Sequence, residues 1–285
     1  MARIFKHSQV EDYFAELDYN QPSEALSATA TELYEAGKAV SVSNLKIDCD
    51  FAFLSELQFD ENLRSNKKFK SLNFSRQYAS KPRVFDELYR DTFGENRDRM
   101  NYFASQVAWI NQQVLEITDT LFPRYDVNRP SVTWRLTDTI NENLHLDVYK
   151  EDFPDHHVRL FVNLDTVPRI WHTSHTLEHL LQHSLHLVDT DLLKSGTPGR
   201  ICHNLNFSVF GDMKCAGREG KDKHIVFFDP GEVWFVDSRK VSHQIFFGRK
   251  ALSTEHQVNP SSMLNPELHY FSIVDRYRKE FLASC

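Results

Sequence analysis

The chain has 285 residues, of which 41% are hydrophobic, and a formal net charge of −7 at pH 7. This length and composition suffice for one large core, so we expect a single structural domain. The acidic total argues against nonspecific binding to nucleic acid. No run approaches the ~18 apolar residues that span a membrane, and residues 1–12 lack the apolar core of an export signal. The four cysteines show no paired spacing, which implies no disulfide framework and suits a reducing cytoplasm.

Helical patterns dominate the first part of the chain. Residues 23–37 carry an amphipathic run between a capping serine and a terminal glycine, which predicts a helix. Residues 39–47 then alternate as a strand, and residues 96–121 form the longest helical pattern, with apolar side chains along one side. We expect residues 1–125 to form a helical or mixed part that packs on the rest of the protein.

Short strand candidates dominate the remainder of the chain. They lie at residues 131–137, 142–149, 157–164, 201–209, 224–229, 232–237, 242–247, 251–258 and 269–274. Many short strands separated by turns are typical of two packed sheets closed as a jelly roll. The expected fold class is therefore mainly β, with a double-stranded β-helix (jelly roll) core over residues 126–285 and flanking helices.

One segment departs from the acidic character of the whole chain. Residues 62–85 contain no acidic residue but seven basic ones: Arg64, Lys67, Lys68, Lys70, Arg76, Lys81 and Arg83. Charge runs of this kind are usually solvated loops. The second interpretation is a docking patch for an anionic substrate or a lipid headgroup, with Lys67, Lys68 and Lys70 as substrate contacts.

The most informative motif is His145-Leu-Asp147, with His243 following 96 residues after the aspartate. Residues 143–149 alternate as a strand, so His145 and Asp147 project to the same side. Two histidines and one carboxylate that hold one face of an iron atom are typical of non-haem Fe(II) oxygenases, which keep three positions open for co-substrate and oxygen. We therefore predict that His145, Asp147 and His243 are the metal ligands and the catalytic centre.

This motif, with Arg249 at the start of the strand after His243, resembles that of the 2-oxoglutarate-dependent oxygenase superfamily. Residues 231–253 also resemble the corresponding stretch of prolyl-hydroxylase-type members. The resemblance implies Fe(II), 2-oxoglutarate as co-substrate, and O2. It further implies a cation for the C5 carboxylate, which Arg249 can grip through two charge-assisted hydrogen bonds while Ser253 adds a hydroxyl donor. The other interpretation of Arg249 is a solvated arginine in a surface turn.

Three more residues are candidates for the same pocket. Arg159 lies on the strand that follows the first two ligands, where its charge assists a carboxylate of co-substrate or substrate. An ion pair with a nearby aspartate is an equally good interpretation of Arg159. Arg135 and Asn163 lie on neighbouring strand candidates and are predicted to contact substrate.

A competing metal motif is present in His175-Thr-Leu-Glu178-His179, the H-x-x-E-H signature of inverted zinc peptidases. Glu255 follows at a spacing that resembles the third ligand of that family. However, Glu255 lies in a strand pattern, whereas those ligands belong on helices. His175, His179, His183 and His186 share a helical spacing, which indicates a wet histidine face, a cleft wall or an adventitious metal site.

The chain as a whole is similar to the Kdo hydroxylases, bacterial 2-oxoglutarate oxygenases of about this length. The stretches that carry this similarity are residues 132–135, 142–150, 158–165 and 230–253. The resemblance implies hydroxylation at C3 of 3-deoxy-D-manno-octulosonic acid (Kdo) in a lipid A–Kdo glycolipid. It also implies a cytoplasmic protein that works at the cytoplasmic face of the inner membrane, with an anionic glycolipid as its partner. The acidic total charge would repel such a substrate, and the basic segment 62–85 offers a local positive surface that would attract it.

Two other classes of function remain open from the sequence. One is a 2-oxoglutarate oxygenase that acts on a protein side chain or a small metabolite. The other is a non-catalytic jelly-roll binding module. Succinate release in the presence of Fe(II) and 2-oxoglutarate distinguishes an enzyme from a binding module.

Overall fold

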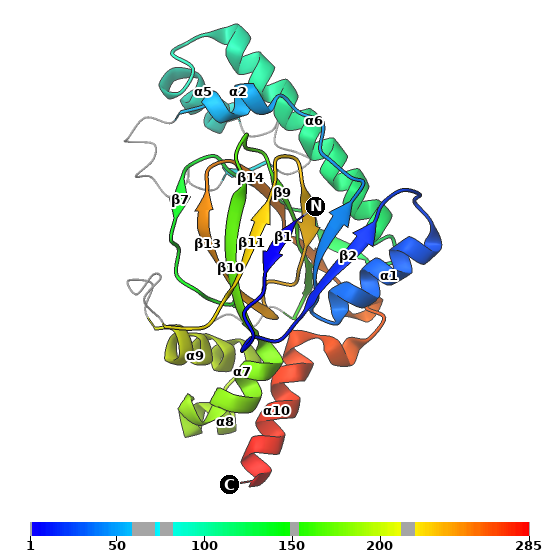
Figure 1. Cartoon of the computed structure of the whole chain (residues 1–285), viewed down its shortest axis with the longest axis vertical. Coiled ribbons are helices and arrows are strands. Elements are labelled where there is room, and N and C mark those ends of the chain that lie inside the picture. The colour runs from blue at the N-terminus through cyan, green and yellow to red at the C-terminus, as the bar shows by residue number, and fades with distance from the viewer. Residues whose placement is uncertain (1, 59–71, 75–81, 149–153, 212–219, 285) are drawn as a thin grey trace.

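The computed structural model describes residues 2–58, 72–74, 82–148, 154–211 and 220–284. Two large β-sheets lie at the centre of the molecule (Figure 1). One group of helices covers one end of these sheets, and a second group lies beyond the opposite end (Figure 1). The sheets therefore form the body on which any site of the central strands is held.

The larger sheet has seven strands in the order β2-β3-β12-β9-β14-β6-β4. Their bounds are β2 (Phe14–Asp18), β3 (Ala39–Ser43), β12 (Val233–Phe235), β9 (Leu160–Asn163), β14 (Ala251–Thr254), β6 (Val132–Arg135) and β4 (Leu72–Asn73). Neighbours pair antiparallel, except that β2 and β3 are parallel. The central strand β9 is buried along its whole length, as expected of a strand covered on both faces.

The smaller sheet has five antiparallel strands in the order β1-β11-β10-β13-β7. Their bounds are β1 (Arg3–Phe5), β11 (His224–Phe228), β10 (Arg169–Thr176), β13 (Val241–Gly248) and β7 (Thr139–Ile140). A third sheet joins β5 (Val127–Arg129), β15 (His256–Val258) and β8 (His156–Val158).

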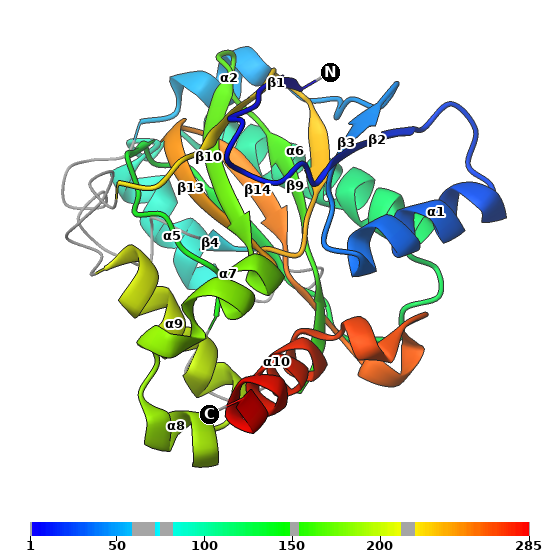
Figure 2. The same ribbon diagram turned by 60° about the horizontal axis from the view of Figure 1, so that its bottom comes forward.

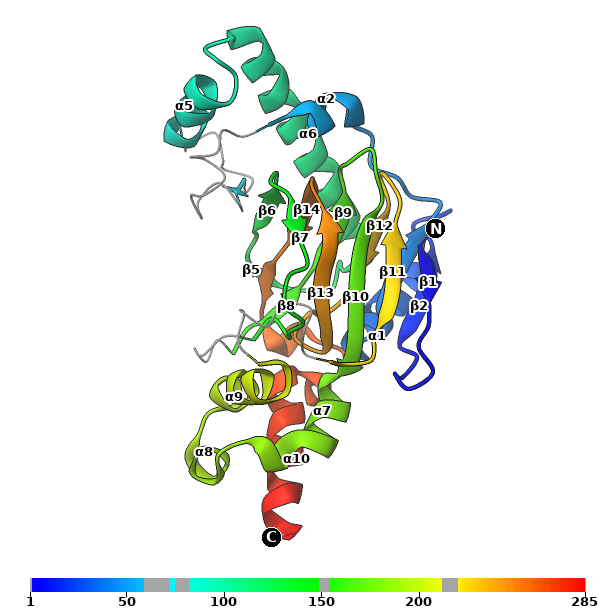
Figure 3. The same cartoon turned by 60° about the vertical axis from the view of Figure 1, so that its left-hand side comes forward.

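From β6 onward the chain crosses repeatedly between the two large sheets. Strands β6, β9, β12 and β14 lie in the larger sheet, and β7, β10, β11 and β13 lie in the smaller one. In Figure 3 the smaller sheet stands in front of the larger one, so the two sheets face each other. The predicted mainly β class is confirmed, and β1, β2 and β3 of the N-terminal part extend both sheets.

Helices of the N-terminal part pack against the larger sheet. They are α1 (Glu24–Glu35), α2 (Phe51–Glu56), α5 (Pro82–Asp91) and α6 (Arg97–Leu121). Ser23 caps α1 by accepting a hydrogen bond from Leu26 N, and Asn96 caps α6 in the same way. The buried stripe of α6 meets the sheet at Trp134, whose indole Nε1 donates to Asn111 Oδ1 at 2.8 Å. Both long helices predicted from the sequence are confirmed.

The helices at the other end of the molecule form a second hydrophobic cluster. They are α7 (Leu177–Ser184), α8 (Thr190–Ser195), α9 (Pro198–Phe210) and α10 (Tyr270–Ser284), with short 3-10 turns at Leu185–Leu187, Pro260–Ser262 and Pro266–Leu268. Figure 2 shows α7 to α10 gathered together below the sheets. The cluster also includes Leu144 and Leu146, so these helices pack directly against the His-x-Asp segment.

Two of the predicted strands are wrong, because residues 201–209 lie in α9 and residues 269–274 open α10. Apolar residues in α9 recur at Ile201, Leu205 and Val209, a helical spacing. Pro198 starts this helix, and Gly211 follows its end with a φ of 78°. In the described part of the predicted strand 142–149, residues 142–148 form one isolated bridge.

Most of the basic segment 62–85 lies outside the described residues, including Arg64, Lys67, Lys68 and Lys70. Among the cysteines that the structure describes, Cys49 and Cys202 are free. Within the described chain, no helix combines the length and apolar character needed to cross a membrane.

Candidate metal centre

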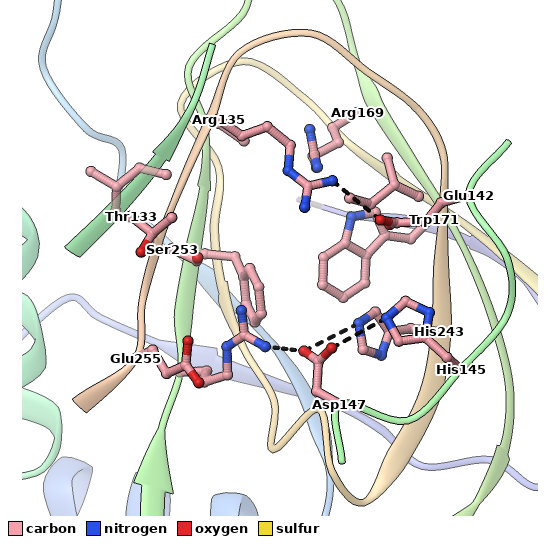
Figure 4. A pocket seen from close by; sticks show the side chains of 15 residues that line it. Thr133, Arg135, Glu142, His145, Asp147, Arg169, Trp171, His243, Ser253 and Glu255 are labelled. Carbon is pink, nitrogen blue, oxygen red and sulfur yellow. Dashed lines mark hydrogen bonds and ion pairs between the residues drawn. The ribbon is translucent and has the colours of Figure 1, made fainter. Parts of the chain in front are cut away.

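The three predicted ligands come together where the His-x-Asp segment meets β13. His145 N donates to His243 O at 3.0 Å, and His243 N donates back to His145 O at 2.8 Å. Asp147 N donates to Ser238 O at 2.9 Å. One side-chain donor atom from each of His145, Asp147 and His243 lies within 4.8 Å of the others. Figure 4 shows the Asp147 carboxylate directed at both imidazoles.

Main-chain carbonyls fix the orientation of both imidazole rings. His145 Nδ1 lies 2.7 Å from Asn143 O, and His243 Nδ1 lies 3.1 Å from Val241 O. A carbonyl oxygen only accepts, so each Nδ1 carries the proton and donates it. The Nε2 atoms face the Asp147 carboxylate at 3.2 and 3.7 Å. Two Nε2 atoms and one carboxylate are a donor set suited to Fe(II), and the residues present therefore fit such an ion.

The protonation of the three groups follows from their mutual contacts. Burial would raise the pKa of Asp147, but Arg159 and the two histidines hold it well below its usual range. Burial acts to lower the pKa of His145, yet the hydrogen bond and charge of Asp147 raise it to about 9. Burial lowers the pKa of His243 to about 4 despite the attraction of Asp147. A metal ion that binds here would displace the proton between His145 Nε2 and Asp147.

Two further side chains hold the triad in place. Arg159 Nη1 donates to Asp147 Oδ2 and, at 2.8 Å, to Ser238 Oγ. The indole of Trp171 stacks on the His243 ring with centroids 5.0 Å apart. Arg159 therefore forms the ion pair with an aspartate that was one of the two interpretations from sequence, and that aspartate is a member of the triad.

The triad lies in the wall of a cavity of about 240 Å³ between the two large sheets. The cavity is lined by Thr133, Arg135, Glu142, His145, Asp147, Arg159, Phe161, Arg169, Trp171, His243, Ile245, Ala251, Leu252, Ser253 and Glu255. Figure 4 places Arg135 and Arg169 across the cavity from the three ligands, with the Trp171 ring between. Of the residues predicted to contact co-substrate or substrate, Ser253, Arg159 and Arg135 line this cavity.

Arg249 and Asn163 lie outside the lining of the cavity. Arg249 donates from Nε and Nη2 to the two carboxylate oxygens of Asp165 at 2.7 and 2.5 Å. The Asn163 side-chain amide donates to Val167 O and Phe228 O, each at 2.9 Å. Arg249 is thus paired with the turn between β9 and β10, and Asn163 links that turn to the end of β11, so this geometry does not support a role for either in co-substrate or substrate binding.

Arg169 is the cavity residue that the sequence argument missed. It begins β10, a strand that was not predicted, and only 3% of its surface is exposed. Burial, followed by the charge of Arg135, lowers the pKa of Arg169 to about 9. Within the described part of the protein, Arg169 Nη1 and Trp171 Nε1 are buried donors without a hydrogen-bond partner. A carboxylate in the cavity would satisfy a buried guanidinium of this kind.

Gly248, the last residue of β13, leaves the space that Arg169 occupies. A Cβ at position 248 would overlap the guanidinium of Arg169. The glycine therefore serves close packing here rather than an unusual backbone conformation. It was not singled out from the sequence, because its partner lies 79 residues earlier in the chain.

Asn206 is a second residue that the sequence argument missed. From α9 its Oδ1 accepts from Leu146 N at 2.9 Å, and its Nδ2 donates to Leu146 O at 3.1 Å. Leu146 is the central residue of the His-x-Asp motif. The Asn206 amide thus supplies main-chain hydrogen bonds that a neighbouring strand would otherwise supply, in a segment that forms one isolated bridge. Asn206 also lines a second cavity of about 280 Å³, which shares Glu142, His145 and Asp147 with the first.

The zinc-peptidase interpretation has no support from the geometry. His175 lies near the end of β10 and His179 in the first turn of α7, so the motif is not one helix. Glu178 pairs with Arg276, and Glu255 lines the triad cavity. Among the described residues, His175 and His179 instead group with Glu11.

We compared the chain with protein-family models, curated proteins and solved structures, and only solved structures match. No protein-family model matches the chain, and no curated protein matches it. Solved structures with the same architecture are non-haem Fe(II) α-ketoglutarate-dependent dioxygenases. They are structures of the Kdo hydroxylase KdoO. The complex with succinate and Fe(III) matches with a TM-score of 0.67 at 14% identity, over 93% of this chain and 95% of that one.

Two further KdoO structures match over the same shares of both chains. The apo structure has a TM-score of 0.66, and the complex with α-ketoglutarate and Fe(III) has a TM-score of 0.63, each at 14% identity. Identity this low establishes a common fold.

Proposed function

We propose that the protein is an Fe(II)- and 2-oxoglutarate-dependent dioxygenase with a jelly-roll core in one structural domain. The observation that carries the proposal is the convergence of His145, Asp147 and His243 in a cavity that also holds a buried arginine with a free donor. The alternation of successive strands between two facing sheets supports the double-stranded β-helix. The fold likeness to KdoO supports the same class.

In this proposal His145 Nε2, His243 Nε2 and one Asp147 oxygen bind Fe(II) and leave three positions open. Bound Fe(II) supplies the activation of O2 that is coupled to oxidative decarboxylation of 2-oxoglutarate. The carbonyls of Asn143 and Val241 keep Nδ1 protonated, so both Nε2 lone pairs stay directed at the ion. Arg159 holds the Asp147 carboxylate by its other oxygen, which limits its rotation.

For the co-substrate we propose Arg169 in place of Arg249. Arg169 offers an unpartnered buried Nη1 inside the cavity, whereas Arg249 lies outside the cavity lining and donates from Nε and Nη2 to Asp165. A carboxylate oxygen accepts a charge-assisted hydrogen bond from Nη1, and the Ser253 hydroxyl lies in the same cavity as a second donor. Arg135 adds positive charge on that side, partly offset by Glu142 at 3.5 Å.

As substrate we propose C3 of Kdo in a lipid A–Kdo glycolipid. The fold likeness to a Kdo hydroxylase supports this class of substrate. The second cavity, which reaches the triad from the side of α9, is lined by the polar residues Asn143 and His203, which could contact a sugar. Peripheral contact with the cytoplasmic face of the inner membrane, through the basic segment 62–85, is part of the same proposal.

The test supplies purified protein with Fe(II), 2-oxoglutarate, O2 and Kdo–lipid A, and measures succinate and the mass of the glycolipid. We expect stoichiometric succinate and a gain of one oxygen on Kdo. The variants His145→Ala, Asp147→Ala and His243→Ala should abolish both, and His186→Ala, an exposed helix residue, serves as control. Succinate without oxygen on Kdo would assign the enzyme to another substrate. Binding of 2-oxoglutarate without any succinate would make the protein a binding module.

A further inference from the structure

A second group of metal-type donors lies where the N-terminal segment meets the end of β10. Glu11 lies between β1 and β2, His175 is the last residue but one of β10, and His179 lies in the first turn of α7. His175 Nδ1 is 2.7 Å from Glu11 Oε2, and His179 Nδ1 is 3.6 Å from Glu11 Oε1. One donor atom from each of the three residues lies within 4.8 Å of the other two. None of the three belongs to the triad.

Thr176 holds the Glu11 carboxylate in position between the two imidazoles. Its main-chain N and its Oγ1 each lie 2.8 Å from Glu11 Oε1 and donate to it. The same Oγ1 accepts from His179 N at 3.3 Å and so caps α7. One threonine therefore orients the carboxylate and fixes the start of the helix that carries His179. Such support from outside the ligand set is typical of metal sites.

The separations between the donor atoms fit a small divalent ion. Ligand atoms about 2.0–2.2 Å from a tetrahedral Zn²⁺ lie about 3.3–3.6 Å from one another. The His179–Glu11 separation of 3.6 Å already matches this range and is too long for a hydrogen bond. The His175–Glu11 separation of 2.7 Å is that of a hydrogen bond, which a metal would replace with a small outward shift.

The imidazoles of His175 and His179 lie side by side next to the Glu11 carboxylate. The rings of His175 and His179 are nearly parallel, with centroids 3.9 Å apart. All three side chains are partly exposed, at 17%, 34% and 31% for His175, His179 and Glu11, so an ion can reach them from solvent.

We propose that Glu11, His175 and His179 bind one Zn²⁺ at a site that is separate from the triad. Two imidazoles and one carboxylate are a common donor set for Zn²⁺, with water completing the fourth position. The ion would fasten the segment between β1 and β2 to the junction of β10 and α7. That junction is bonded to β13 as well, because Ser242 Oγ donates to His175 O at 2.7 Å.

The test uses protein with the triad removed by His145→Ala and His243→Ala, freed of metal with a chelator and titrated with Zn²⁺. We expect one equivalent of tightly bound Zn²⁺ and a higher melting temperature. Adding Glu11→Gln or His179→Ala should weaken binding by more than about 100-fold, since loss of an outer-shell partner already costs 10–100-fold. Circular dichroism checks that each variant is folded, and Glu11→Gln keeps the shape of the side chain that Thr176 holds.

The matched control is His183→Ala, which removes the next ring of the histidine stack and leaves the three ligands. His183 lies with its ring centroid 4.2 Å from that of His179, and its Nδ1 donates to His179 O. Retained Zn²⁺ binding in this variant supports the site. Two results would overturn the proposal: no Zn²⁺ bound by the triad-free protein, or binding that survives Glu11→Gln but is lost in His183→Ala. The second result would indicate an adventitious histidine stripe.

Discussion

At the scale of single residues, the arginines around the triad differ in their hydrogen-bond partners. Arg159 is bonded to Asp147, Arg249 to Asp165, and Arg169 retains a buried donor without a partner among the described residues. An unpaired buried guanidinium lowers the free energy of unfolding, and an anionic ligand that binds beside it supplies the missing partner. Our proposal of Arg169 as the cation for the co-substrate therefore rests on its unpartnered buried donor and not on a position after the second histidine in the sequence.

We expect Arg169→Met to raise the KM for 2-oxoglutarate by about 10–150-fold, because a hydrogen bond to a charged group contributes about 1.5–3 kcal/mol. Arg169→Lys should restore part of the loss, since lysine supplies the charge without the planar fork. The measurement is succinate release over a range of 2-oxoglutarate concentrations.

The control for this prediction is Arg249→Met, which should leave the KM for 2-oxoglutarate near that of the wild type. A larger effect in Arg249→Met than in Arg169→Met would return the role to Arg249. Gly248→Ala gives an independent check, because the added methyl displaces the Arg169 guanidinium and should also raise this KM.

At the scale of elements, helix α9 supplies hydrogen bonds to the main chain of the His-x-Asp segment, which elsewhere in the molecule come from a neighbouring strand. Residues 142–148 carry two of the three predicted ligands, yet they join the smaller sheet through the isolated His145–His243 bridge and a main-chain hydrogen bond from Glu142 N to Ile245 O. Asn206 of α9 pairs with both main-chain polar groups of Leu146, and Leu146 packs into the cluster of the C-terminal helices. The precision of the triad should therefore depend on a helix that holds none of the metal ligands.

We expect Asn206→Leu to lower the affinity for Fe(II) by about 10–100-fold, as is typical when a partner that orients a ligand is removed. The reason is that Leu146 N loses its hydrogen-bond partner and Leu146 O keeps only its bond from Val148 N, while the ligands themselves remain. The affinity is measured by titrating metal-free protein, and the far-ultraviolet circular dichroism spectrum should stay unchanged.

Arg200→Ala, an exposed position on the same helix, is the matched control for Asn206→Leu. It should bind Fe(II) like the wild type. Unchanged Fe(II) affinity in Asn206→Leu would contradict the positioning role. An altered circular dichroism spectrum would assign the loss to unfolding of α9.

Buried neutral histidines give the whole molecule a predictable dependence on acid. Burial, followed by the charge of Arg239, lowers the pKa of His157 to about 3 and that of His269 to about 4. The unfolded chain binds protons at these positions below about pH 6.5, whereas the folded chain does not. Stability therefore rises with pH through this range and falls when the pH drops below 6.5.

From pH 7 to pH 5 we expect each of the two histidines to remove about 2 kcal/mol from the free energy of unfolding. His269→Asn should reduce the pH-dependent loss by about that amount, and asparagine can still accept the bond from Phe271 N. Urea denaturation at both pH values measures the effect, with the exposed His186→Asn as control. An equal pH dependence in His269→Asn and wild type would contradict this account.

Charge distribution leads to a second expectation for the whole molecule. If the basic segment contacts an anionic surface, reversing Lys67, Lys68 and Lys70 to Glu should weaken activity on glycolipid embedded in vesicles, most strongly at low salt. Each basic residue near such a surface contributes about 1 kcal/mol, screened within about a Debye length. Succinate release without glycolipid should barely change. Equal losses in both assays would indicate misfolding, and no loss in either would make the segment a solvated loop.

The sequence by itself determined the features that depend on local spacing. Residues close together in the sequence are enough to predict the amphipathic helices α1 and α6, the alternation of most central strands and the His-x-Asp spacing. Local pattern failed where a short apolar run suits either element. Residues 201–209 and 269–274 became helices because their apolar faces pack into a shared cluster with Leu144 and Leu146.

Only the tertiary structure decided which distant side chains meet. Arg169 and Gly248, Asn206 and Leu146, and Glu11 with His175 come from segments 60 to 164 residues apart. No periodicity links such positions, because their contact results from how strands and helices cross in space. The same holds for Arg249, whose partner Asp165 lies 84 residues away and accepts from its Nε and Nη2. Spacing along the chain predicted the metal donors, whereas packing selected the residues that orient them.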